Sequence, residues 1–187
     1  MNRKTGILLF LLFALASCES YTPKPKGYMR FDFPEKEYRL FDSTCPFRFE
    51  YPTYGNMVSA EEHNCWYNLS FPQYLATIYL SYQPIDDNLA ELLDDAHVFA
   101  YRHDVKANAI EARFVENKND DLVGLLFDIE GNAASSVQFF VTDSINHFLR
   151  GSLYFYTAPN SDSLAPLIDF FRADIEHLIE TVDFKNQ

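Results

Sequence analysis

The fold is decided by residues 110–157, which read IEARFVENKNDDLVGLLFDIEGNAASSVQFFVTDSINHFLRGSLYFYT. Apolar and aromatic runs at 110–116, 122–130, 135–142 and 147–157 are separated by short gaps rich in Asn, Asp, Gly and Ser. Runs of this length, bounded by turn residues, are typical of strands joined by hairpins. The segment therefore predicts an antiparallel meander of four strands.

Two helices and three more strands are predicted around this meander. The strands, at 47–51, 66–71 and 76–82, are alternating or apolar runs that stop at or near a proline. A helix over 88–106 follows, in which Asn88 and Glu91 have the spacing of a capping box.

A last helix begins near Ser161 or Asp162 and has apolar residues at helical spacing as far as Val182. Its acidic residues are expected on the outer face; they are Asp169, Asp174, Glu176 and Glu180.

This element order predicts an α+β domain with a mostly antiparallel sheet of about seven strands, flanked by two main helices. The order resembles that of the Mog1/PsbP-like fold, in which helices sandwich a sheet. A chain of 187 residues fits one such domain.

The N-terminus predicts a lipoprotein. Residues 1–17 have a basic start and an apolar run that is too short to span a bilayer. Leu15-Ala16-Ser17-Cys18 then matches the lipobox, in which the Cys thiol receives diacylglycerol before the signal peptide is removed. Acyl chains contribute about 0.8 kcal/mol per buried methylene, so two or three of them hold a protein in a membrane. The alternative is an ordinary signal peptide with an incidental Cys18.

We therefore divide the chain into a signal peptide at 1–17, a tether at 18–40 and a single domain at 41–187. The prolines of the tether favour extended geometry, and its aromatic residues suggest that it docks on the domain or on a partner. The domain carries 23 acidic and 8 basic residues. This balance argues against nucleic-acid binding and is expected to keep the domain away from anionic headgroups.

Cys45 and Cys65 remain once Cys18 is lipidated, and an even pair in an exported domain predicts a disulfide. The alternative is a metal site that uses His63 with both thiols. We predict no metal site and no cofactor, because His63-Asn64-Cys65 has no paired metal-binding motif beside it.

No catalytic residue is predicted. The chain has no nucleophile elbow, P-loop, dinucleotide-binding glycine pattern or His-Glu-x-x-His motif. Neighbouring acids such as Glu61-Glu62 diverge on a strand or helix and do not form an acid–base couple. A glycosidase-type pair of carboxylates from distant segments stays open.

Three serines are candidates for O-glycosylation, because they stand in Asp-Ser triplets that resemble the acceptor motif of exported Bacteroidetes proteins. They are Ser43, Ser144 and Ser163. The alternative is that Asp-Ser serves local turn and helix-start chemistry.

The lipobox, the arm YTPKPKGY at 21–28 and the segment FPEKEY at 33–38 together resemble the gliding-motility-associated lipoprotein family of the GldD type. The resemblance is sharpest over 18–38 and extends more loosely to the last helix. It implies a role in Bacteroidetes gliding and the allied type IX secretion machinery, as a non-enzymatic envelope component. Cys18 is the one functional residue that it transfers.

We therefore expect a lipoprotein in the cell envelope, anchored to the lipid bilayer through acylated Cys18 and facing the periplasm. Its expected partners are other gliding or secretion envelope proteins. The alternative is an envelope enzyme, such as a glycan- or wall-acting hydrolase. A third hypothesis is a small-ligand carrier, which would need a sizeable apolar cavity.

Overall fold

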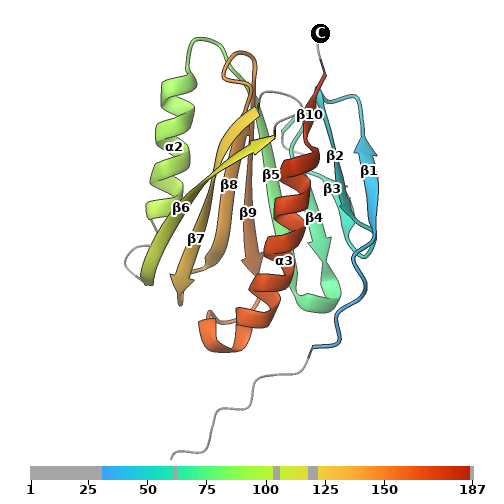
Figure 1. The fold of residues 1–187 in the computed structure, drawn as a ribbon, viewed down its shortest axis with the longest axis vertical. Helices are drawn as coiled ribbons and strands as arrows, with labels where there is room; N and C mark the ends of the chain where they lie inside the picture. Colours follow the sequence, from blue (N-terminus) through green and yellow to red (C-terminus); the bar gives the residue numbers. More distant parts are fainter. Residues whose placement is uncertain (1–30, 61–62, 103–105, 118–121, 186–187) are drawn as a thin grey trace, which may run out of the picture.

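The computed structural model describes residues 31–60, 63–102, 106–117 and 122–185. Within these ranges the chain forms a seven-stranded sheet, a three-stranded sheet and two long helices (Figure 1). All neighbouring strands of the larger sheet are antiparallel. In spatial order they are β3 (Asn56–Ser59), β4 (Tyr67–Phe71), β5 (Ala76–Pro84), β9 (His147–Phe155), β8 (Ser135–Thr142), β7 (Leu122–Gly131) and β6 (Ala107–Asn117).

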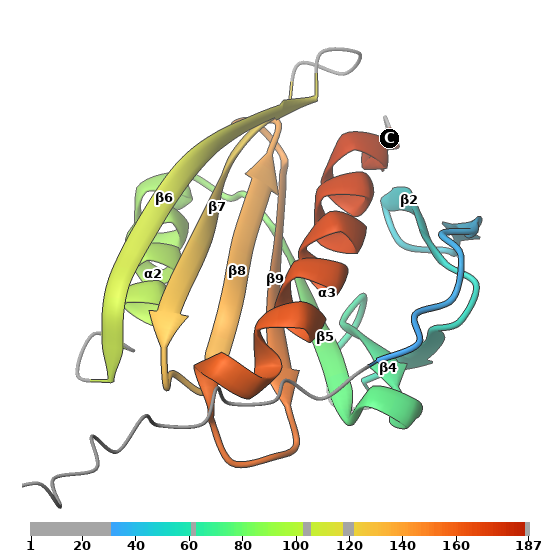
Figure 2. The same ribbon diagram turned by 60° about the horizontal axis from the view of Figure 1, so that its bottom comes forward.

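The smaller sheet packs with one helix against a single face of the larger sheet. Its strands, in the order β1-β2-β10, are β1 (Tyr38–Asp42), β2 (Phe47–Pro52) and β10 (Asp183–Phe184). The helix α3 (Ser161–Thr181) lies beside it, and α2 (Leu89–Tyr101) covers the opposite face (Figure 2). A short 3-10 helix, η1 (Pro72–Tyr74), joins β4 to β5.

The α+β class and the four-stranded meander are confirmed, since β6, β7, β8 and β9 are successive neighbours. The mostly antiparallel sheet of about seven strands is also confirmed, but one of its members differs from the prediction. The strand predicted at 47–51 is β2, which lies in the smaller sheet, and the unpredicted β3 completes the larger one. The likeness to the Mog1/PsbP-like fold stays a prediction.

The prediction for the first helix is correct at its start, where Asn88 is the N-cap, but wrong at its end and in its capping box. α2 ends at Tyr101, and Lys106 lies outside it. Asn88 is the N-cap, but its side chain does not cap the helix. Its Oδ1 instead accepts a hydrogen bond from the backbone N–H of Asp86, so the capping box does not form.

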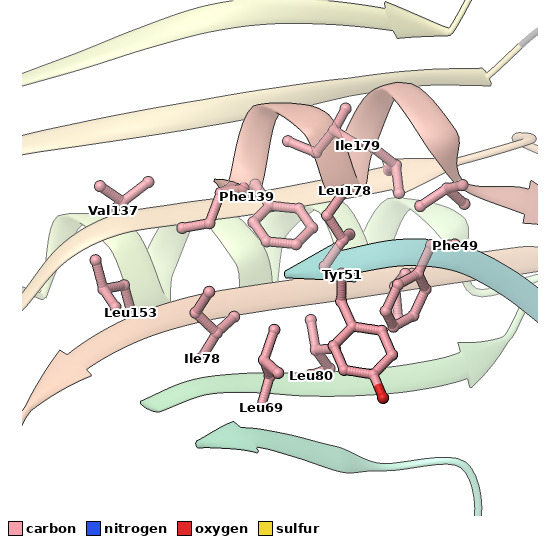
Figure 3. Close-up of a cluster of buried hydrophobic side chains, with 14 of the residues drawn as sticks. Phe49, Tyr51, Leu69, Ile78, Leu80, Val137, Phe139, Leu153, Leu178 and Ile179 are labelled. Atoms are coloured by element: carbon pink, nitrogen blue, oxygen red, sulfur yellow. The ribbon is translucent and has the colours of Figure 1, made fainter. Parts of the chain in front are cut away.

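The main core fills the space between the two sheets with aromatic side chains. Phe47 and Phe49 of β2 are fully buried against Phe71 of β4 and Phe171 of α3 in the same apolar cluster. Figure 3 shows how side chains from both sheets and from α3 converge there. Because phenylalanine rings occupy this space, the sandwich gives no support to the small-ligand carrier hypothesis.

Gly151 is required by this packing. A Cβ on Gly151 would lie 2.2 Å from the ring of Phe139, its cross-strand neighbour in β8. A residue with a side chain would therefore displace a buried ring. A smaller apolar cluster on the other face packs α2 against Phe127, Phe140 and Phe148.

The described part of the predicted tether belongs to the folded body. Phe31 and Phe33 pack against the main core, and Tyr38 begins β1. The predicted boundary between residues 40 and 41 falls inside β1. The segment before it is part of the body because its aromatic side chains pack on α3.

Candidate functional site

The segment that leads from the predicted lipid anchor into the body is fastened to α3. The ring of Phe33 stacks on that of Phe170 with 4.3 Å between centroids. Lys36 Nζ donates a hydrogen bond to the carbonyl oxygen of Phe170 at 2.8 Å and lies 3.5 Å from the Phe170 ring centroid. We call the cluster of Phe33, Lys36, Tyr38, Tyr54, Phe170 and Asp174 the anchor junction.

A buried carboxylate lies at the centre of the anchor junction. The side chain of Asp174, on α3, has 0% exposure. Its oxygens accept hydrogen bonds from Tyr54 Oη at 2.6 Å and Tyr38 Oη at 3.1 Å, and Lys36 Nζ lies 2.7 Å away. The donors come from two places in the chain, the N-terminal segment with Lys36 and Tyr38 and the β2–β3 turn with Tyr54. A single aspartate therefore holds the N-terminal segment, the β2–β3 turn and α3 together.

Burial governs the protonation of this cluster. It lowers the pKa of Lys36, against the opposing effect of Asp174, which favours the ammonium. It also raises the pKa of Tyr54 and Tyr38, and the neighbouring Asp174 raises both further. Both hydroxyls therefore stay neutral donors to the carboxylate.

A second contact extends the anchor junction to β2. The ring of Tyr38 stacks on His177 of α3 at 3.6 Å between centroids. His177 Nε2 lies 2.8 Å from Glu50 Oε2 of β2. Since Asp174 is buried and already has three donors, the arrangement is suited to holding elements together rather than to reacting with a substrate.

A broad groove of about 490 Å³ lies on the far side of the same helix, between α3 and the strands β6 and β7. It is mostly acidic. Its charged lining consists of Glu111, Asp128, Glu130, Asp162, Asp169 and Arg172.

Two acids of the groove, Asp128 on β7 and Asp169 on α3, are joined through one arginine. Arg172 Nε donates to Asp128 Oδ1 at 2.6 Å, and Arg172 Nη1 donates to Asp169 Oδ1 at 2.5 Å. Partial burial opposes the charge of Arg172, but these two carboxylates raise its pKa. Asp128 and Asp169 thus act as counter-ions of a guanidinium, which is a poor arrangement for a general acid and its partner base.

The structure joins Cys45 and Cys65 by a disulfide. Cys45 precedes β2 in the smaller sheet, and Cys65 precedes β4 in the larger sheet, so the bridge connects the two sheets at one end. Both sulfurs are used in this bond, which leaves no thiolate for the alternative metal site with His63.

The three glycosylation candidates lie in different surroundings. Ser144 is exposed in the β8–β9 turn. Ser43 is half-buried, and its Oγ accepts a hydrogen bond from the backbone N–H of Cys45. Ser163 is half-buried in the first turn of α3, where its N–H donates to the Asn160 cap. Glycosylation of these residues stays a prediction.

The remaining predicted site residue, Cys18, lies outside the described residues, as do 18–30 of the tether. In the described part of the chain, no helix is long and apolar enough to cross a bilayer. No group of three or more His, Cys, Asp or Glu side chains is arranged to hold a metal ion within the same ranges.

The sequence does not indicate the anchor junction, and the prediction that Asp174 lies on the outer face of the last helix is wrong. The charge of Asp174 favours that outer face. However, Leu167, Phe171, Asp174 and Leu178 follow the 4-3-4 spacing of one helix face, and all four are buried. The spacing therefore indicates that Asp174 is buried, although an aspartate is usually exposed.

Fold and site together define an α+β protein whose N-terminal segment is tied into its core and whose main groove is acidic. The family model described as gliding motility lipoprotein GldD matches residues 18–184, and the chain belongs to this family. The match begins at the predicted lipidated Cys18 and ends in β10. No match was found among curated proteins.

Proposed function

We propose that the protein is a lipid-anchored envelope component that supports gliding motility and type IX secretion, as a non-enzymatic assembly or stabilising component. Membership of the gliding motility lipoprotein family supports the motility role. The anchor would be acylated Cys18, and the body would face the periplasm.

The anchor junction is the observation that carries a structural role. Residues 33–38 are fixed to α3 by stacking, a cation–π contact and the buried Asp174. Load applied at the lipid would thus pass directly into the longest helix of the body. The 13 residues from Cys18 to Arg30 span at most about 45 Å when extended, which limits how far the body can stand from the bilayer.

The proposal is tested by comparing a deletion strain with strains that carry Cys18→Ala and Asp174→Ala. We expect deletion to abolish colony spreading and secretion, and Cys18→Ala to release the product from the membrane fraction. Asp174→Ala should keep the lipid anchor but weaken function in proportion to the loss of folded protein. Normal spreading and secretion in the deletion strain would refute the proposal.

The non-enzymatic role is tested separately in the groove. A triple variant, Asp128→Asn, Asp169→Asn and Arg172→Gln, removes every charge of the bridge and keeps side chains of similar size. We expect spreading and secretion to continue when membrane levels match those of the wild type. If both activities are lost at matched levels, the carboxylates have a direct role, and the hydrolase alternative gains support.

Partners are tested by cross-linking in intact cells followed by isolation of the membranes. Under the proposal, the same gliding or secretion proteins are recovered with the wild type and lost with Cys18→Ala. Recovery that does not depend on the anchor would contradict the proposed membrane-bound assembly role.

A further inference from the structure

The strand β6 is a long and exposed sheet edge. It spans 11 residues at one end of the seven-stranded sheet, whereas β3 at the other end has four. A strand at an edge leaves alternate backbone N–H and C=O groups unpaired, and these can form a ladder with another strand. Short length or proline often blocks such an edge, and β6 has neither.

The side chains of β6 divide between the two faces of the sheet. Arg113 points to the α3 face, where it lies near Asp128 and Glu176. Glu111, two residues earlier, shares this face. Ile110 packs against the apolar cluster under α2, and Phe114, on the same face as Ile110, is 86% exposed.

The sequence of β6 is complementary to itself about its midpoint, Ala112. If a second copy of β6 is laid antiparallel about a two-fold axis at Ala112, each Glu111 lies opposite the partner's Arg113. Each exposed Phe114 lies opposite the partner's Ile110 on the other face. Residues 109–115 pair without interruption in this register, and the irregularity between Ala107 and Ala109 lies at the end of the ladder, opposite the partner's residues 115–117.

We propose that two copies of the protein associate through antiparallel pairing of their β6 strands, with the two-fold axis at Ala112. The pairing makes one continuous sheet from two seven-stranded sheets. It adds two symmetric Glu–Arg pairs and two symmetric Phe–Ile pairs to the backbone ladder. This inference rests on the edge itself and not on the proposed function.

The overall charge of the protein makes such pairing selective. The full chain has a net charge of −12, so two bodies repel each other unless opposite charges meet at the contact. Arg113 is the one basic residue of β6, and among two-fold antiparallel registers it lies directly opposite an acid only in the one proposed.

Single cysteines in the full-length lipoprotein test the register in intact cells. In the proposed dimer, Ala112 faces its own copy, at the Cβ separation of about 4.5–5.5 Å found in directly opposed pairs. We expect Ala112→Cys to give a disulfide-linked dimer on non-reducing gels. The matched control is Ala109→Cys, an exposed alanine of the same strand, whose two copies would lie about 20 Å apart.

Charge exchange on the Ala112→Cys background tests the pairing of Glu111 with the partner's Arg113. Glu111→Arg places two arginines opposite each other, and Arg113→Glu places two glutamates opposite each other. Each variant alone should lower the dimer yield about tenfold. When the two variants are expressed together with different tags, every opposed pair again has opposite charges, so mixed dimers should return to the wild-type yield.

Two controls keep this test decisive. Glu116→Arg makes the same charge change within β6, but Glu116 lies opposite the partner's Asn108, so the dimer yield should be unchanged. Circular dichroism of each purified variant shows whether it is folded, since Arg113→Glu also removes the contacts with Asp128 and Glu176. No cross-link with Ala112→Cys, an equal cross-link with Ala109→Cys, or failure of the mixed variants to pair would overturn the proposal.

Discussion

Lys36 Nζ lies 2.7 Å from the carboxylate of Asp174, and this contact joins the segment next to the predicted lipid anchor to the C-terminal helix. The aspartate side chain has 0% exposure, whereas that of Lys36 has 30%. The burial of the Asp174 carboxylate therefore depends on the Lys36 ammonium and on the two tyrosine hydroxyls that donate to it. Loss of the carboxylate would leave all three donors without their shared acceptor.

We expect Asp174→Ala to lower the free energy of unfolding by about 2–4 kcal/mol, because it breaks a buried and hydrogen-bonded ion pair. The corresponding fall in melting temperature is about 2–4 °C per kcal/mol for a chain of this size. Thermal unfolding of the purified lipoprotein, followed by circular dichroism, measures it. Asp169→Ala on the same helix is the control, because the Asp169 side chain is 70% exposed and should contribute less than about 1 kcal/mol. Equal effects of the two variants would contradict this account.

Tyr54 predicts a loss of stability at alkaline pH. Burial, together with Asp174, raises the pKa of Tyr54 in the folded protein, whereas tyrosine in an unfolded chain ionises near pH 10. Below about pH 10 both states hold the proton, and the stabilisation is complete. As the pH rises above that value the unfolded chain loses protons first, so unfolding becomes more favourable.

The variant Tyr54→Phe tests this pH dependence. At pH 8 it should be less stable than the wild type by about 1.5–3 kcal/mol, since it loses a hydrogen bond to a charged acceptor. The difference should shrink as the pH approaches 11, where the wild type loses the same contribution. Tyr101→Phe, on the exposed side of α2, should change stability little at either pH. A constant difference between Tyr54→Phe and the wild type from pH 8 to 11 would show that the tyrosine pKa is not involved.

The meander and both helices were predictable because their signals are local. β7 and β8 have apolar runs bounded by turns, and α3 has its apolar residues on one face. The second sheet was not predictable, because β1 and β10 gain their pairing from β2, which lies far from β10 along the chain. β3 has four residues and little apolar alternation, so its pairing with β4 is what defines it.

The candidate site was also predictable only where the signal is local in the sequence. The sequence indicated Cys18, and it indicated Cys45 and Cys65 as a pair, because cysteine number and placement carry chemical meaning. It did not indicate that Lys36, Tyr54 and Asp174 meet, because their contact depends on how the N-terminal segment crosses α3. The buried face of α3 could have identified Asp174, but not its partners.

The disulfide gives a further stability prediction. Cys45 and Cys65 are 20 residues apart, and closing a loop of this length stabilises the folded state by about 3 kcal/mol in the chain-entropy model. We expect the double variant Cys45→Ala, Cys65→Ala to melt at a temperature lower by about 6–12 °C. Reduction of the wild type with dithiothreitol should have the same effect, and it should not further lower the melting temperature of the double variant. Equal melting of oxidised and reduced wild type would contradict the prediction.

The β8–β9 turn shows a structural role for the aspartate of its Asp-Ser pair. Asp143 Oδ1 accepts hydrogen bonds from the backbone N–H groups of Ile145, Asn146 and His147. Burial alone would raise the pKa of Asp143, but these donors hold it below its ordinary value. The aspartate therefore has a structural task in the turn, whereas the hydroxyl of Ser144 is on an exposed residue.

We predict that, if the native protein is O-glycosylated, Ser144 is modified in preference to Ser43, whose hydroxyl is half-buried and hydrogen-bonded. The intact mass of protein purified from its own cells should then exceed the lipidated polypeptide mass, and Ser144→Ala should remove the excess. Ser43→Ala is the control and should leave the mass excess in place. Asp143→Asn should lower stability, since a neutral amide accepts these hydrogen bonds less strongly. A native mass equal to that of the lipidated polypeptide would leave turn chemistry as the whole explanation of Asp143-Ser144.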